Sequence, residues 1–234
     1  MSSEPALHVA VPPGDVRAVA LVLHGGRETG TTPVRATQLA VLRMTPFAAS
    51  LRRSGRDHGL AVARLRYLVR GWNGTARSPV PDVEWALEQV AARFAAAPVA
   101  LVGHSMGGRA AIYAAGHESV RAVVGLAPWL ERDDPSAPVA ERHVLLAHGQ
   151  RDRITSPKAA AAWIGRAGSV AASASFVAIK DEGHAMLRRA PLWHALTSAY
   201  VLAVLCGAPL PDGRRAPGAD VVAKVLAGDA SLVV

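Results

Sequence analysis

The chain has 234 residues, of which 50% are apolar and 19% charged, with a formal net charge of +8 and one cysteine, Cys206. This length is typical of one α/β domain. The apolar content excludes a disordered chain, which lacks the apolar surface to offset its loss of conformational entropy. A single cysteine excludes an intrachain disulfide framework and a multi-cysteine metal site.

Neither a membrane nor a nucleic acid is predicted as a partner. The longest apolar run, near residues 200–210, is interrupted by Pro209 and is shorter than the ~20 residues of a membrane span. The N-terminus has no apolar signal core. The arginines that carry the charge are spread along the chain without interleaved aromatic residues. We therefore expect a soluble cytoplasmic protein that acts on a small molecule, and the sequence leaves its oligomeric state open.

Strand-like and helix-like segments alternate along the chain, which is typical of a mainly parallel sheet covered by helices. Prolines and glycines mark the expected helix ends, and Ser156 is the expected N-cap of a helix that begins at Pro157. The predicted strands are residues 6–11 at the sheet edge, 17–24, 60–68, 99–102, 120–127, 143–148 and 174–180, and the other predicted helices are 46–58, 81–97, 106–117 and 191–206.

Three segments lie outside this alternation. Residues 27–45 have weak helical periodicity and are expected to form a structured loop. Residues 128–142 form a charged link that is too short for a helical lid domain. Residues 1–206 are predicted to form the α/β domain. Residues 207–234 consist of a Gly/Pro/Arg-rich linker and an apolar end, and are predicted to form a tail that packs on this domain or on a partner.

The strongest motif is Gly103-His104-Ser105-Met106-Gly107, which follows a predicted strand and opens a predicted helix. In this G-x-S-x-G pattern the serine lies on a strained turn that exposes its hydroxyl, and the flanking glycines allow close backbone approach. The helix that follows directs its N-terminal dipole toward developing negative charge. The motif predicts a nucleophilic serine.

A serine nucleophile needs a base and a carboxylate that orients the base, in the chain order serine, acid, histidine for this type of sheet. Asp152 and His184 each follow the end of a predicted strand, where α/β sheets place their sites. We expect them to complete a triad with Ser105. Asp133, Asp134 and Asp181 are alternative acids, and His24 and His148, at strand ends, are expected to bond to backbone.

Two backbone N–H groups are expected to stabilise the oxyanion that forms when the serine attacks a carbonyl carbon. One belongs to Met106. The other comes from the His24-Gly25-Gly26 turn, with Gly26 as the first choice and Arg27 as the second.

The segments HGG, GHSMGG, HGQRD and EGHAM, in this order between about Val19 and Tyr200, resemble the α/β-hydrolase superfamily. The chain is most similar to small lidless bacterial serine esterases near the dienelactone-hydrolase branch. The resemblance implies a Ser105–His184–Asp152 triad and no large cap. Dienelactone hydrolases have cysteine in place of Ser105, so their substrate is not carried over.

The sequence thus predicts a serine hydrolase that cleaves carboxylic esters through an acyl-enzyme. The alternatives are a thioesterase or another acyl hydrolase, a lyase or perhydrolase on the same scaffold, and a non-catalytic ligand-binding protein. Arg27, Trp72 and Trp129 follow strand ends and are candidate substrate contacts in an open, shallow site that accepts short esters without interfacial activation. No metal- or cofactor-binding motif is present, so no metal or cofactor is expected.

Overall fold

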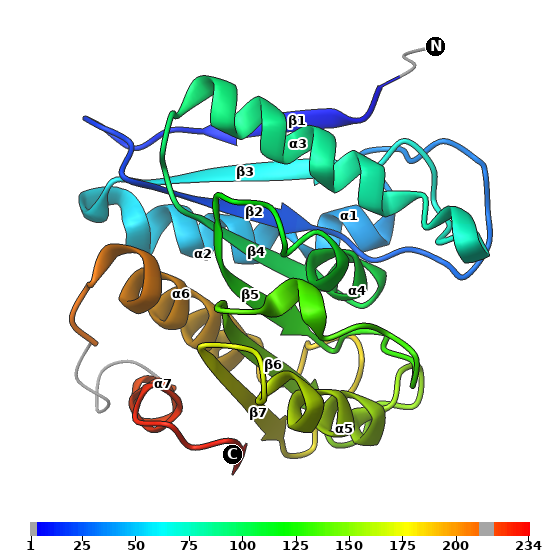
Figure 1. Cartoon of the computed structure of the whole chain (residues 1–234), viewed down its shortest axis with the longest axis vertical. Coiled ribbons are helices and arrows are strands. Elements are labelled where there is room, and N and C mark those ends of the chain that lie inside the picture. The colour runs from blue at the N-terminus through cyan, green and yellow to red at the C-terminus, as the bar shows by residue number, and fades with distance from the viewer. Residues whose placement is uncertain (1–3, 211–217) are drawn as a thin grey trace.

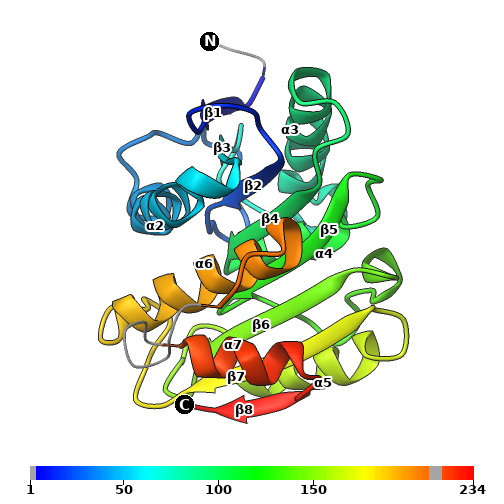
Figure 2. The same ribbon diagram turned by 90° about the vertical axis from the view of Figure 1, so that its left-hand side faces the viewer.

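A computed structural model describes residues 4–210 and 218–234. In these ranges eight strands form one sheet in the order β1-β3-β2-β4-β5-β6-β7-β8 (Figures 1 and 2). The edge strand β1 pairs antiparallel with β3, and the other pairs are parallel. The strands are β1 (Ala6–Ala10), β2 (Ala18–Leu23), β3 (Leu60–Arg66), β4 (Val99–His104), β5 (Val120–Leu126), β6 (His143–Gly149), β7 (Ser173–Ile179) and β8 (Ser231–Val233).

Helices cover both faces of the sheet, as Figure 2 shows. α3, α4 and α5 bury apolar residues on one face, and α2, α6 and α7 on the other. β2 illustrates the reason: its alternate side chains point into opposite clusters, so all six of its residues are buried. The helices are α1 (Leu39–Arg43), α2 (Thr45–Gly55), α3 (Pro79–Arg93), α4 (Met106–Tyr113), α5 (Pro157–Ala167), α6 (Ala190–Cys206) and α7 (Ala219–Leu226).

Several predicted helix ends were wrong. α3 begins at Pro79, two residues early, because both of its prolines fit the first turn, where a missing N–H costs nothing. It ends at Arg93 because Phe94 leaves helical geometry, with φ −134°. α4 ends at Tyr113 rather than at residue 117, and a tighter turn follows in which Ala115 N–H donates to the Ile112 carbonyl.

Other local expectations were confirmed. Ser156 caps α5 by accepting a hydrogen bond from the Ala159 N–H at 3.1 Å. Gly207 ends α6 in the left-handed region at φ 60°. Residues 27–45 form the expected structured loop, which also contains the short helix α1.

The C-terminal segment packs against the sheet. α7 contacts α6, and β8 pairs in parallel with β7 at the edge opposite β1 (Figure 2). Most of the expected Gly/Pro/Arg-rich linker, residues 211–217, lies outside the described residues.

One feature bears on access to the carboxyl end of the sheet. The link between β5 and β6 holds a single 3-10 turn, Ala137–Val139, so no large cap is inserted there.

Within the described ranges, no helix combines the length and the apolar character that spanning a bilayer requires.

The strand order reverses between β2 and β4: the chain passes from β2 outward to β3 and then returns to β4 on the other side. Open parallel sheets bind ligands at such a switch point, beyond the carboxyl ends of the strands. The His24-Gly25-Gly26 turn follows β2, and Ser105 follows β4. The topology therefore brings these two sequence motifs side by side.

Candidate active site

Ser105 lies on a strained turn between β4 and α4. Its backbone has φ 54° and ψ −118°, a conformation that L residues rarely adopt. A Cβ on Gly107 would lie 2.5 Å from the His24 carbonyl oxygen, and one on Gly103 would overlap the Gly107 carbonyl. Both flanking positions therefore require glycine, and the half-buried serine is held at the mouth of the sheet.

Neighbouring loops surround this turn. The Ser105 N–H donates to the Leu126 carbonyl at 3.0 Å, and the Ser105 carbonyl accepts from the Trp129 N–H at 3.1 Å. On the other side, a Cβ on Gly25 would be 3.4 Å from Ser105 Cβ. The serine is thus enclosed by the segments that follow β2 and β5.

Asp152 and His184 are paired as predicted. His184 Nδ1 lies 2.8 Å from Asp152 Oδ2, and the Asp152 side chain is fully buried. Oδ1 accepts from the N–H groups of Ile154 and Thr155 at 2.8 and 3.0 Å. Burial alone would raise the pKa of Asp152, but hydrogen bonds from His148, His184 and these N–H groups hold it well below its usual value. Asp152 is therefore an ionised acceptor facing His184.

His104 connects the serine's strand to the loop of His184. The two imidazole rings are 4.7 Å apart between centroids, and His104 Nε2 donates to the His184 carbonyl at 3.0 Å. Burial, with a smaller contribution from the neighbouring His184, lowers the pKa of His104 to about 3, so its ring is neutral.

Ser105 and His184 accordingly lie on adjoining segments. Their side chains share no hydrogen bond in the part of the chain that the structure describes. Such bonds are often long before substrate binds.

The backbone N–H groups of Gly26 and Met106 have no acceptor among the described residues, whereas Arg27 N–H donates to the Arg70 carbonyl at 2.9 Å. Met106 opens α4, where the first N–H groups have no helical partner. A Cβ on Gly26 would overlap the Met106 side chain, so the two positions are in contact. Of the two candidates that follow β2, Gly26 therefore has a free N–H donor and Arg27 does not.

The alternative acids are engaged elsewhere. Buried Asp134 pairs with Arg109 at 2.8 Å and accepts from the Tyr113 hydroxyl at 2.7 Å. Asp181 pairs with Arg151 on the surface, and Asp133 is exposed.

His24 and His148 differ from each other in their partners. His24 bonds to backbone as expected, through the Gly25 carbonyl and the Tyr67 N–H. The expectation for His148 was wrong: its Nε2 donates to Asp152 Oδ2 at 3.0 Å. The HGQRD turn reverses the chain after β6 and brings residues 148 and 152 together. Sequence reasoning also missed Thr155, whose hydroxyl donates to the same oxygen at 2.8 Å.

The candidate substrate contacts differ in exposure. Trp72 is buried at 4% exposure, Trp129 is half-buried and Arg27 is exposed. The two indoles contact each other edge-on, and the Arg109 guanidinium lies over both rings, 4.4 and 4.6 Å from their centroids. Trp129 is therefore held in place by its contacts with Arg109 and Trp72.

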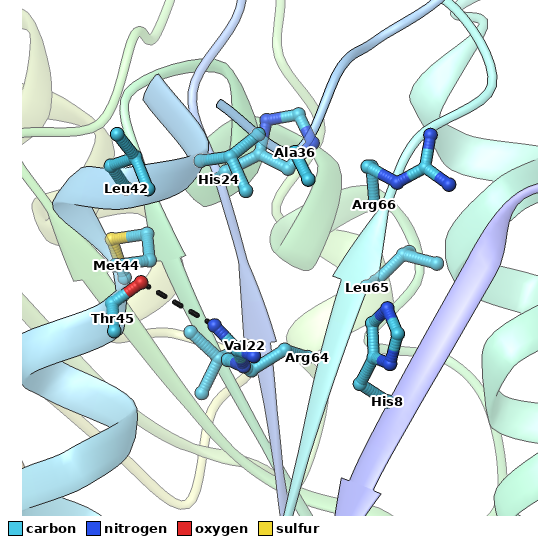
Figure 3. A pocket seen from close by; sticks show the side chains of 11 residues that line it. His8, Val22, His24, Ala36, Leu42, Met44, Thr45, Arg64, Leu65 and Arg66 are labelled. Carbon is cyan, nitrogen blue, oxygen red and sulfur yellow. Dashed lines mark hydrogen bonds between the residues drawn. The ribbon is translucent and has the colours of Figure 1, made fainter. Parts of the chain in front are cut away.

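A cavity of about 90 Å³ opens beside the His24-Gly25-Gly26 turn, on the α2 face of the sheet (Figure 3). Burial lowers the pKa of His24, which lines it, to about 4, so that ring is neutral. Ser105 does not line this cavity, whose other lining residues are His8, Val22, Ala36, Val41, Leu42, Met44, Thr45, Arg64, Leu65 and Arg66. In the described ranges, no group of three histidine, cysteine or acidic side chains is arranged to hold a metal ion.

Comparison with known families identifies the chain. The family model described as serine aminopeptidase, S33, matches residues 14–143, which is more than half of the 234 residues. The chain belongs to the serine aminopeptidase S33 family. The match contains the Ser105 turn but ends before Asp152 and His184, whose pairing rests on the geometry above.

Solved structures share the fold of this family member. An alpha-beta serine hydrolase homologue from Coxiella burnetii has 16% identity over 85% of this chain and 97% of its own, with a TM-score of 0.59. An esterase domain from Rhodothermus marinus has 19% identity over 84% and 92%, with a TM-score of 0.60. A Xanthomonas campestris protein described as a serine hydrolase without lid has 20% identity over 80% and 89%, with a TM-score of 0.53.

No curated protein matches the sequence. The family match and these neighbours establish an α/β-hydrolase fold without a large cap, in a family of serine hydrolases and esterases.

Proposed function

We propose that this protein hydrolyses carboxylic esters through an acyl-enzyme on Ser105. The observation that carries the proposal is the strained serine turn beside a hydrogen-bonded Asp152–His184 pair. Strain of this kind persists only where surrounding structure maintains it, and it is concentrated at functional sites.

In the first half-reaction, Ser105 Oγ attacks the ester carbonyl carbon while His184 Nε2 takes the hydroxyl proton. Asp152 accepts the His184 Nδ1–H, which keeps Nε2 free as the base and stabilises the imidazolium. The carbonyl electrons move onto oxygen, and the N–H groups of Gly26 and Met106 donate to that oxyanion.

Collapse of the tetrahedral intermediate breaks the bond to the alcohol oxygen, which takes the proton from His184. In the second half-reaction a water molecule attacks the acyl carbon and gives a proton to His184. Ser105 then leaves, recovers the proton, and the carboxylic acid is released.

The carboxylates that adjoin His184 favour esters over peptides with a free amino terminus, because both are already engaged by donors of this chain. An aminopeptidase needs a carboxylate to hold the substrate's ammonium group. Asp152 is occupied by its own donors, and buried Glu182 accepts from Gly183 N–H, Arg189 N–H and Trp193 Nε1. Arg43, which donates to the Ala185 carbonyl at 2.8 Å, places positive charge beside the His184 loop.

The missing cap favours short, freely diffusing esters, with Trp129 and Arg27 as walls and Trp72 supporting them. Thioesters use the same chemistry and are the nearest alternative substrates. Cytoplasmic location and a division of the chain at residue 206 stay predictions.

The test is hydrolysis of p-nitrophenyl esters of increasing acyl length, of matching thioesters and of aminoacyl p-nitroanilides. We expect the fastest turnover on short esters, its loss in Ser105→Ala, and its retention in Ser169→Ala, a control at an exposed serine. Turnover that survives in Ser105→Ala, or faster cleavage of the anilides, would contradict the proposal.

A further inference from the structure

A second histidine shares the carboxylate of the proposed triad. His148, on β6, is fully buried, and its Nε2 is 3.0 Å from Asp152 Oδ2. The same oxygen is 2.8 Å from His184 Nδ1. One carboxylate oxygen thus faces two imidazole rings, one of which has no route to the substrate.

The protonation of His148 follows from its partners. The ionised carboxylate can only accept, so His148 Nε2 carries the proton and donates it. His148 Nδ1 is buried and has no hydrogen-bond partner in ranges 4–210 and 218–234, as expected for a neutral ring that carries its one proton on Nε2. Burying a polar ring with one nitrogen unsatisfied is unfavourable for folding, and an apolar side chain at this strand position would avoid that penalty.

Thr155 completes the arrangement. Its hydroxyl donates to Oδ2 at 2.8 Å and lies 3.2 Å from both His148 Nε2 and His184 Nδ1. The carboxylate is therefore fixed on the Oδ1 side by backbone N–H groups, and on the Oδ2 side by Thr155 and His148 before His184 is counted.

We propose that His148 is a positioning residue for the hydrolysis: it holds the Asp152 carboxylate in line with His184 and disperses part of its negative charge. This inference rests on the proposed function. Because His148 and His184 draw on the same oxygen, removing His148 leaves more of the carboxylate's charge to stabilise protonated His184. The pH at which the base becomes available therefore depends on His148.

Other charged or titratable groups also face this pair. His104, on β4, packs against His184 with the rings tilted by 44°, and Arg43 approaches the same loop from α1. Glu182 lies two residues before His184, with its carboxylate held by Gly183 N–H, Arg189 N–H and Trp193. None of these groups contacts Asp152 Oδ2, so substitution of His148 changes that oxygen's environment without removing them.

The test compares His148→Gln with His148→Met. These side chains are similar in length and shape, but only glutamine places an N–H donor near the position of Nε2. We measure kcat per active site, with sites counted by fluorophosphonate labelling, together with KM and the pH profile of kcat/KM on a short p-nitrophenyl ester.

In His148→Met we expect kcat per site to fall roughly tenfold with KM nearly unchanged, as for loss of a charge-assisted hydrogen bond. We expect the acid limb of the profile to move to higher pH by about half a unit or more. His148→Gln should recover most of both effects. A purely structural role would lower melting temperature and the number of labelled sites but leave kcat per site and the pH profile unchanged.

Equal kcat and equal pH profiles in the two variants, with Ser105 of the wild type labelled, would overturn the role of His148 and leave the proposed function standing. An unlabelled wild type would overturn both. If the methionine variant does not fold, proton NMR decides: two low-field imidazole N–H signals of the wild type should shift or disappear in Asp152→Asn, and a change in only one would contradict the shared carboxylate.

Discussion

Replacing Asp152 with asparagine keeps the shape of the side chain but turns one hydrogen-bond acceptor into a donor. Oδ1 accepts from two backbone N–H groups, at 2.8 Å from Ile154 and 3.0 Å from Thr155. The amide oxygen must take this place, because backbone N–H groups can only donate, whereas His148 and the Thr155 hydroxyl at the Oδ2 position can change tautomer or rotate to accept. The NH₂ group is then forced into the position of Oδ2, facing His184 Nδ1.

His184 must consequently accept at Nδ1 and carry its proton on Nε2. That tautomer donates toward Ser105 where the reaction needs an acceptor. Loss of the correct tautomer costs about 10⁴-fold in kcat, which corresponds to ~5.5 kcal/mol of transition-state stabilisation. A short ester assay with active-site titration measures this fall.

The control is Asp181→Asn, the same change at an exposed ion pair with Arg151, where side-chain exposures are 64% and 65%. We expect it to keep wild-type kcat. A folded Asp152→Asn protein whose kcat lies within tenfold of wild type would refute the tautomer reasoning.

Three further predictions concern stability and the serine turn. Gly107→Ala should abolish activity and destabilise the fold by more than about 3 kcal/mol, because its Cβ meets two backbone carbonyls. The control Gly165→Ala, in α5 with open space around it, should instead increase the free energy of unfolding in urea by up to ~1 kcal/mol. Arg109→Met leaves buried Asp134 without its cation and should lower the free energy of unfolding by about 3–5 kcal/mol. Arg151→Met, at an exposed ion pair, should lower it by less than ~1 kcal/mol. Equal losses of stability in the two variants would contradict this prediction. Burial lowers the pKa of His24 to about 4 and that of His104 to about 3, below the usual 6.5. Between each lowered pKa and 6.5 the unfolded chain binds more protons than the folded one. Stability should therefore fall as pH drops below about 6.5, by ~1.4 kcal/mol per pH unit for each ring. Urea unfolding at pH 7, 6 and 5 measures this slope, and a flat response would show that these rings are not buried neutral.

The parts of the site that sequence could predict are those determined by local geometry. The glycines around Ser105 are required by backbone contacts two residues away, so the motif carries its own structure. Asp152 and His184 follow strands, and parallel strands bring their carboxyl ends to one edge. The order of motifs was therefore enough to predict that Asp152 and His184 pair.

The parts that sequence could not predict depend on packing between distant segments. His148 looked like a strand-end histidine, and its bond to Asp152 depends on how the 149–152 turn packs against the Glu182 backbone. Arg109 gave no signal of contacting Trp72 and Trp129, residues from two other loops. β8 has three residues, too few to show a pattern, and forms only because β7 offers an edge.

Intact-mass analysis after fluorophosphonate treatment tests the central claim that Ser105 is an activated nucleophile. We expect one adduct per chain on the wild type and on Ser169→Ala, and none on folded Ser105→Ala. A folded wild type that acquires no adduct, or an adduct that persists in Ser105→Ala, would contradict it.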